Sequence, residues 1–148
     1  MTERELKDFF EKVRRARGMA NELAEQRTQL RSDAVSIKAV QYDKDKVTSG
    51  NISDLSDVII RLEEKLRKLD AEYLEEMDKL LRMRLQAQDY LKYLDDVDRK
   101  YSRVLTKRYI NDMPWDHVAE EVSYTVDYCW HLRDDAISHI VCRMNKSD

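Results

Sequence analysis

Apolar residues recur at alternating intervals of three and four along two stretches of the first 94 residues. This repeat averages 3.5 residues and is typical of helices that supercoil around a partner. Thr2 and Glu5 form a capping-box pair before the first stretch, and Ser53 can cap the second. The expected contact positions are Leu6, Phe9, Val13, Ala16, Ala20, Leu23, Arg27, Leu30, Ala34 and Ile37, then Leu55, Ile59, Leu62, Leu66, Leu69, Tyr73, Glu76, Leu80, Met83, Ala87, Tyr90 and Leu94.

The polar segment 42–53, which contains Gly50, interrupts the repeat between the two stretches. A chain that turns back there brings two helices of similar length together. At 1.5 Å per residue each would be a rod of roughly 60 Å. The pattern therefore predicts a long antiparallel coiled-coil hairpin over residues 1–94, in which Arg27 and Glu76 are the polar exceptions.

The repeat is interrupted again at Asp95, which with Asp98 can cap a new helix. This helix is expected to continue through Ile110. A turn over 111–113 follows it, and Pro114 suits the first position of the next helix. The sequence thus indicates a boundary at the end of the hairpin and a supporting helix beyond it.

Residues 95–148 are expected to form a small C-terminal domain around two helices that cross at an angle. Ala119 is small enough to allow the close approach of the second helix, and Thr125 is a preferred N-cap for that helix. A polar tail is expected over 145–148. The arrangement indicates a helix-turn-helix whose inward-facing positions are Val118, Ala119, Val122, Cys129, Leu132 and Ala136.

A family resemblance rests on Arg108-Tyr109-Ile110, Trp115, Val118-Ala119-Glu120-Glu121-Val122, Tyr124-Thr125 and Ala136-Ile137. With these residues the last third of the chain resembles the C-terminal helix-turn-helix of phage transcriptional regulators, which is similar to region 4 of sigma-70-type factors. Asp45 to Ser49, before Leu55 to Leu62, resembles the loop between the long helices of some of these proteins. The resemblance is to RinA- and ArpU-type activators of late or packaging genes. It implies a phage- or prophage-encoded protein of the bacterial cytoplasm that regulates transcription by binding double-stranded DNA.

In the docking geometry of this motif, residues near the N-terminus of the second helix reach base edges in the major groove. The base-facing candidates are Thr125, Val126, Asp127, Tyr128, Trp130, His131 and Asp134. The phosphate-binding candidates are Lys107, Arg108 and Arg133. Further cations that could flank the groove are Arg99, Lys100, Arg103 and Arg143.

The charge balance leaves other functions open. Residues 95–148 hold 8 Lys or Arg and 11 Asp or Glu, and relatives usually carry Arg or Lys where Asp127, His131 and Asp135 stand. An acidic surface suits a basic protein partner, so the alternative is an interaction module that docks on RNA polymerase or another phage protein without binding DNA. A further alternative is a small terminase-like packaging subunit, which would assemble as a ring.

The composition narrows the class of protein. Two Gly, one Pro and 39% charged residues in 148 favour an all-helical chain, and its elongated apolar faces favour a homo-oligomer, most simply a dimer. The sequence contains no membrane-spanning run and no secretory signal. It also contains no phosphate-binding Gly-rich loop or nucleophile triad, so neither catalysis nor a cofactor is expected. A zinc ion shared by Cys129, His131, His139 and Cys142 is not expected either, because helix residues two apart point to different sides.

Overall fold

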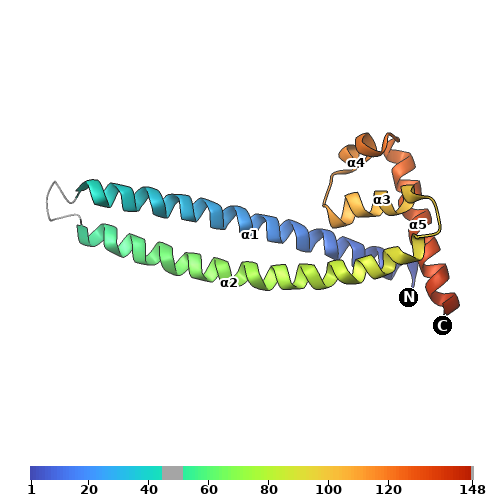
Figure 1. The fold of residues 1–148 in the computed structure, drawn as a ribbon, viewed down its shortest axis with the longest axis horizontal. Coiled ribbons are helices and arrows are strands. Elements are labelled where there is room, and N and C mark those ends of the chain that lie inside the picture. Colours follow the sequence, from blue (N-terminus) through green and yellow to red (C-terminus); the bar gives the residue numbers. More distant parts are fainter. Residues whose placement is uncertain (45–51, 148) are drawn as a thin grey trace. The chain divides into compact units, whose positions relative to one another are not determined.

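The computed structural model describes residues 1–44 and 52–147, with the side-chain surroundings of 1–40 and 55–146. Over these residues the chain is all-helical, which confirms the predicted class. The elements are α1 (Glu3–Lys44), α2 (Ile52–Leu91), the 3-10 turn η1 (Lys92–Leu94), α3 (Arg99–Leu105), the π-helical turn η2 (Thr106–Ile110), α4 (Trp115–Val122) and α5 (Val126–Ser147) (Figure 1).

Three predicted caps are confirmed. The backbone N–H of Glu5 donates to the Thr2 hydroxyl over 3.2 Å, while the Glu5 carboxylate accepts the Thr2 N–H over 3.3 Å. The Asp98 carboxylate accepts a backbone N–H of α3 over 3.0 Å, and the Thr125 hydroxyl accepts one from α5 over 3.2 Å. The side chain of Ser53 and residues 45–49 lie outside the described residues.

Helix boundaries differ from the sequence prediction at several places. The two long helices extend into the expected loop 42–53, because α1 continues to Lys44 and α2 begins at Ile52. Pro114 has an extended backbone (ψ 149°) and precedes α4, so the helix begins one residue later than expected. Residues 145–147 of the expected polar tail are helical instead, because α5 continues to Ser147. In its last turns Arg143 donates to the Tyr93 carbonyl over 2.5 Å and pairs with Asp96, so this end of α5 is held against η1 and the residues after it.

The chain divides into two compact units. One, the two-helix unit, comprises residues 20–77; the other, the multi-helix unit, comprises residues 1–19 and 78–148. This grouping differs from the predicted division into 1–94 and 95–148. The start of α1 and the end of α2 belong with the C-terminal helices because they contribute side chains to the same core.

In the two-helix unit α1 and α2 run antiparallel (Figure 1). Arg27 pairs with Asp70 at 2.6 Å, and Lys38 further along α1 pairs with Glu63 earlier in α2 at 3.2 Å. The guanidinium of Arg27 also lies 4.3 Å from the centre of the Tyr73 ring. The polar exception in the first apolar repeat is therefore a cross-helix contact within this unit.

The apolar repeat predicts burial well. Each contact position of either stretch that the sequence predicts is buried or partly buried in the unit to which it belongs. Phe10 is not one of those positions, yet it is completely buried. Its ring lies 5.6 Å from that of Tyr109, because the first turns of α1 meet the C-terminal helices as well as α2 and so bury a wider stripe.

The core of the multi-helix unit draws on α1, α2, η1, α3, η2 and α5. Its central aromatic residue is Tyr109, which is fully buried. Outside this core, Arg14 of α1 pairs with Asp112 in the turn after η2 at 3.3 Å, and Asp112 has a left-handed backbone (φ 54°). The core consists of Leu6, Phe10, Val13, Ala87, Leu94, Leu105, Tyr109, Ile110, Ala136, Ile137, Ile140 and Val141.

Candidate nucleic-acid interface

The turn between α4 and α5 is built on a left-handed residue. Ser123 has φ 62° and ψ 39°, a conformation that ends a helix. The backbone N–H of Tyr124 then donates to the Ala119 carbonyl over 3.1 Å. Thr125 follows and caps α5, so three residues connect the two helices. The predicted turn at 123–124 and its cap are present.

A second apolar cluster lies beneath this turn and fixes the two helices on α3. It consists of Val104, Val118, Ala119, Val122, Cys129 and Leu132. The predicted inward-facing residues of α4 and α5 are all buried. Burial raises the pKa of the Cys129 thiol above its ordinary value, so the thiol stays protonated and acts as a core side chain.

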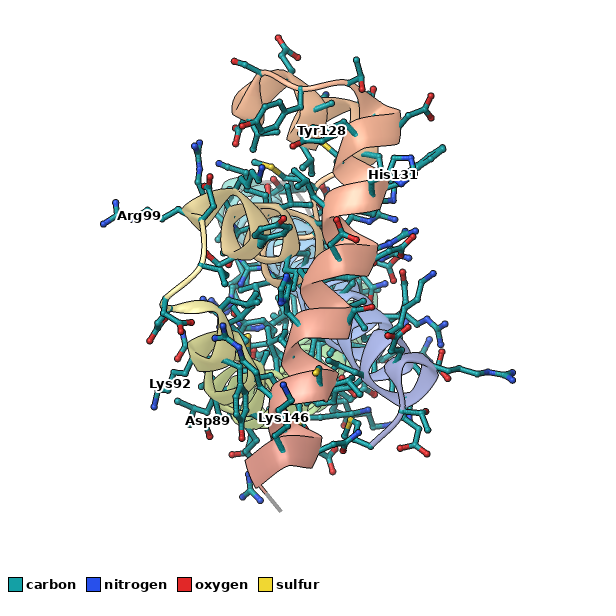
Figure 2. The ribbon with its side chains drawn as sticks, turned by 90° about the vertical axis from the view of Figure 1, so that its right-hand side faces the viewer. Asp89, Lys92, Arg99, Tyr128, His131 and Lys146 are labelled. Atoms are coloured by element: carbon teal, nitrogen blue, oxygen red, sulfur yellow. The ribbon has the colours of Figure 1, made fainter. Side chains whose placement is uncertain are left out.

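The N-terminal half of α5 presents most of the base-facing candidates to solvent. Thr125, Asp127, Tyr128, Trp130, His131 and Asp134 are exposed. Tyr128 and His131 are three apart and lie near the α4 end of α5 (Figure 2). Val126 departs from the prediction, because it is partly buried against the second apolar cluster. Its side chain is thus partly turned from the exposed face toward this cluster.

Tyr128 connects this exposed face to α3. Its hydroxyl accepts a hydrogen bond from the Lys100 ammonium over 3.1 Å, and its ring meets that of Tyr124 edge-on at 4.9 Å. The hydrogen bond to Tyr128 raises the pKa of Lys100 above its ordinary value. Lys100 therefore carries its positive charge at neutral pH beside the residues predicted to face DNA.

The three phosphate-binding candidates already have partners within the multi-helix unit. Lys107 pairs with Glu121 of α4 at 2.5 Å. Arg108 donates to the Met113 carbonyl over 2.9 Å. Arg133 pairs with the neighbouring Asp134 at 3.0 Å, and only 16% of its side chain is exposed. Each cation is thus less available to a phosphate than the sequence suggests.

Two of these cations lie close to one aromatic ring. The guanidinium of Arg108 lies 4.9 Å from the Trp115 ring centre, and that of Arg133 lies 5.3 Å from it. Tyr109 meets the same ring edge-on at 6.2 Å. Three of the residues that carry the family resemblance, Arg108, Tyr109 and Trp115, therefore form one packed cluster with Arg133.

The charge of the multi-helix unit is segregated by element. Residues 99–108 contain Arg99, Lys100, Arg103, Lys107 and Arg108 and no carboxylate. The exposed side of α5 carries Asp127, Asp134 and Asp135 instead. Figure 2 shows Arg99 of α3 projecting outward. The net charge of residues 95–148 is negative although this segment is cationic, so the segment is apparent only when charge is summed over about ten residues.

No match was found when the chain was compared with models of protein families, with curated proteins and with solved structures. Among the residues that the structure describes, no group of three or more His, Cys, Asp or Glu side chains could hold a metal ion. The described helices also include none with the length and apolar character to cross a membrane. The geometry of α3 to α5 is therefore the basis for the functional argument.

Proposed function

We propose that this chain is a DNA-binding transcriptional regulator of phage type. In this proposal α4 and α5 form a helix-turn-helix, the N-terminal half of α5 enters the major groove, and the antiparallel coiled-coil helices α1 and α2 pair two copies of the chain. The observation that carries the proposal is the contact between Lys100 and Tyr128. It joins the cationic segment 99–108 to the exposed side of α5.

The charge distribution supports separate roles for α3, which provides affinity, and α5, which provides selectivity. Affinity for duplex DNA comes largely from cations that neutralise phosphates and release their counterions. The cations of α3 supply that attraction. Tyr128 and His131 can donate hydrogen bonds to bases or phosphates, while Asp127 can accept one from the amino group of a cytosine. Acidic residues on α5 then contribute to selectivity at some expense of affinity.

The experiment is a titration of the full chain with random duplex at low salt, followed by light scattering on the same sample. We expect saturable binding by a dimer that weakens steeply as salt is added. A Tyr128→Ala, His131→Ala double variant should bind more weakly. Lys146→Gln is the control, since Lys146 lies at the far end of α5 from Tyr128 (Figure 2). Absence of binding by the native chain at low salt would contradict the proposal.

A second candidate function is docking on a protein. The observation that favours it is that Lys107, Arg108 and Arg133 already have partners within the multi-helix unit. The exposed surface of α5, in contrast, carries carboxylates. Exposed aromatic residues, Tyr124 at 41% and Trp130 at 41%, lie near them. Aromatic anchors are enriched in protein interfaces, and a basic partner such as a surface of RNA polymerase would complement the charge.

The two candidates separate in a competition experiment. Purified RNA polymerase from the bacterial host and duplex DNA are each titrated against the native chain and against Trp130→Ala. A docking module should bind polymerase, lose that binding on Trp130→Ala, and ignore the duplex. A regulator that reads DNA should bind the duplex in the absence of polymerase.

A further inference from the structure

A polar depression of about 240 Å³ lies on the multi-helix unit where α3 passes into η2. Its volume is below the roughly 300–1,000 Å³ of sites for drug-sized ligands, so it suits a small chemical group. Every residue that lines it has a polar or charged side chain; these are Ser102, Arg103, Thr106, Lys107 and Asn111.

The hydrogen-bonding capacity of this lining matches an oxyanion. The Arg103 guanidinium is exposed and has no ion-pair partner among the described residues. Lys107 holds Glu121 through its ammonium, which has three N–H groups and so retains others for a further acceptor. The Thr106 hydroxyl and the Asn111 amide add neutral donors. None of the described residues that line the depression carries a carboxylate.

The place of the depression connects it to α5. Arg103 is three residues after Lys100 and four after Arg99, so these three cations are neighbours on the surface of α3. Lys100 in turn contacts Tyr128. A phosphate bound at Arg103 would therefore lie one helical turn from the contact between α3 and the predicted base-facing side chains.

We propose that this depression binds a phosphate group, with Arg103 as its principal cation. The proposal deepens the proposed function and rests on it for the source of that phosphate, which is the backbone of duplex DNA. The same chemistry would accept free phosphate. The Glu121 carboxylate weakens phosphate binding at this site because it pairs with Lys107. Removal of the negative charge of Glu121 therefore strengthens phosphate binding.

The experiment uses the full chain and four variants. Arg103→Gln removes the principal cation, Glu121→Gln releases Lys107, and Lys146→Gln removes one charge from a distant exposed position. Arg103→Lys retains the charge without the planar guanidinium. Each variant is checked by thermal unfolding, then titrated with random duplex across a range of salt concentrations and with inorganic phosphate, observed through the Asn111 side-chain amide by NMR.

For random duplex DNA we expect Arg103→Gln to weaken binding. It should also reduce the slope of log K against log salt concentration by about 0.9, the value for one lost phosphate contact. Glu121→Gln should steepen the slope, Lys146→Gln should leave it unchanged, and Arg103→Lys should retain most of it. This result supports the depression as a contact for the DNA backbone.

The other outcomes separate the two proposals. If the duplex binds and Arg103→Gln behaves like Lys146→Gln, the depression is not a phosphate site although the proposed function stands. If the duplex fails to bind but inorganic phosphate shifts the Asn111 amide only when Arg103 is present, the depression is a site for free phosphate and the proposed function fails. If neither ligand binds, both are overturned.

Discussion

The ammonium of Lys100 on α3 donates a hydrogen bond to the hydroxyl of Tyr128 on α5 over 3.1 Å. The two residues are 28 positions apart in the sequence, so no local pattern could reveal the contact. It places a cation from the basic segment 99–108 against the exposed side of an acidic helix. Since both side chains are near the surface, the contact matters for the position and charge of Lys100 more than for the stability of the fold.

The effect on Lys100 gives the first prediction. Tyr128→Phe removes the hydroxyl that accepts the hydrogen bond but keeps the ring. We therefore expect the pKa of Lys100 to fall toward its ordinary value, measured by NMR titration of its side-chain nitrogen. Tyr124→Phe is the matched control, because Tyr124 contacts the Tyr128 ring and has no hydrogen bond to Lys100 in the structure. An equal fall in both variants would contradict the assignment.

The glycine in α1 gives the second prediction. Gly18 lies in the middle of a helix, where glycine is about 1 kcal/mol less favourable than alanine. A β-carbon at this position would meet the Asp112 carboxylate at 3.6 Å, which is ordinary van der Waals contact. Gly18→Ala should therefore stabilise the chain by about 0.5–1 kcal/mol, measured as a higher urea midpoint. A lower midpoint would mean that the space beside Asp112 is already filled.

The extent to which sequence alone predicts this fold can be judged from its helices. The apolar repeat identified the buried positions of α1 and α2, because burial of a helix face depends on spacing that the sequence displays directly. The caps Thr2, Asp98 and Thr125 were also predictable, since a hydroxyl or carboxylate before a helix has one common role. These features are local.

The features that sequence did not reveal depend on contacts between distant segments. Phe10 is buried because Tyr109 covers it, and nothing near Phe10 in the sequence indicates this partner. Arg108 and Arg133 both pack close to the Trp115 ring, whereas the sequence analysis treated them as cations available to phosphates. The candidate base-facing positions followed from helical spacing, but Val126 is turned partly inward because it packs against the second apolar cluster.

The left-handed residue between α4 and α5 gives the third prediction. Ser123 has φ 62°, a conformation that costs an L-residue roughly 1–2 kcal/mol and that glycine adopts without that cost. Ser123→Gly removes this cost from the folded state. Part of the resulting stabilisation is offset because glycine is also freer in the unfolded chain. We expect a net stabilisation of about 0.5 kcal/mol, measured by urea denaturation. Ser102→Gly, inside α3, is the control and should destabilise by a similar amount or more.

The pairing of Asp96 with Arg143 gives a pH-dependent prediction. The hydrogen bond from Arg143 lowers the pKa of Asp96 below its ordinary value, so the folded state binds this proton less readily than the unfolded state. The stability contributed by the pair is therefore fully present above the unfolded pKa of about 3.9. It is lost as the pH falls through the lower folded value.

This stability change can be isolated with two neighbouring variants. Asp96→Asn should be less stable than the native chain at pH 7, but the difference should shrink as the pH is lowered from about 5 to below the folded pKa of Asp96. Asp95→Asn, a neighbouring exposed carboxylate with no ion pair among the described residues, should show no such convergence. Urea midpoints measured at several pH values provide the comparison. Parallel curves for the native chain and Asp96→Asn would mean that Arg143 does not hold Asp96 in solution, and that other contacts keep the last turns of α5 against η1.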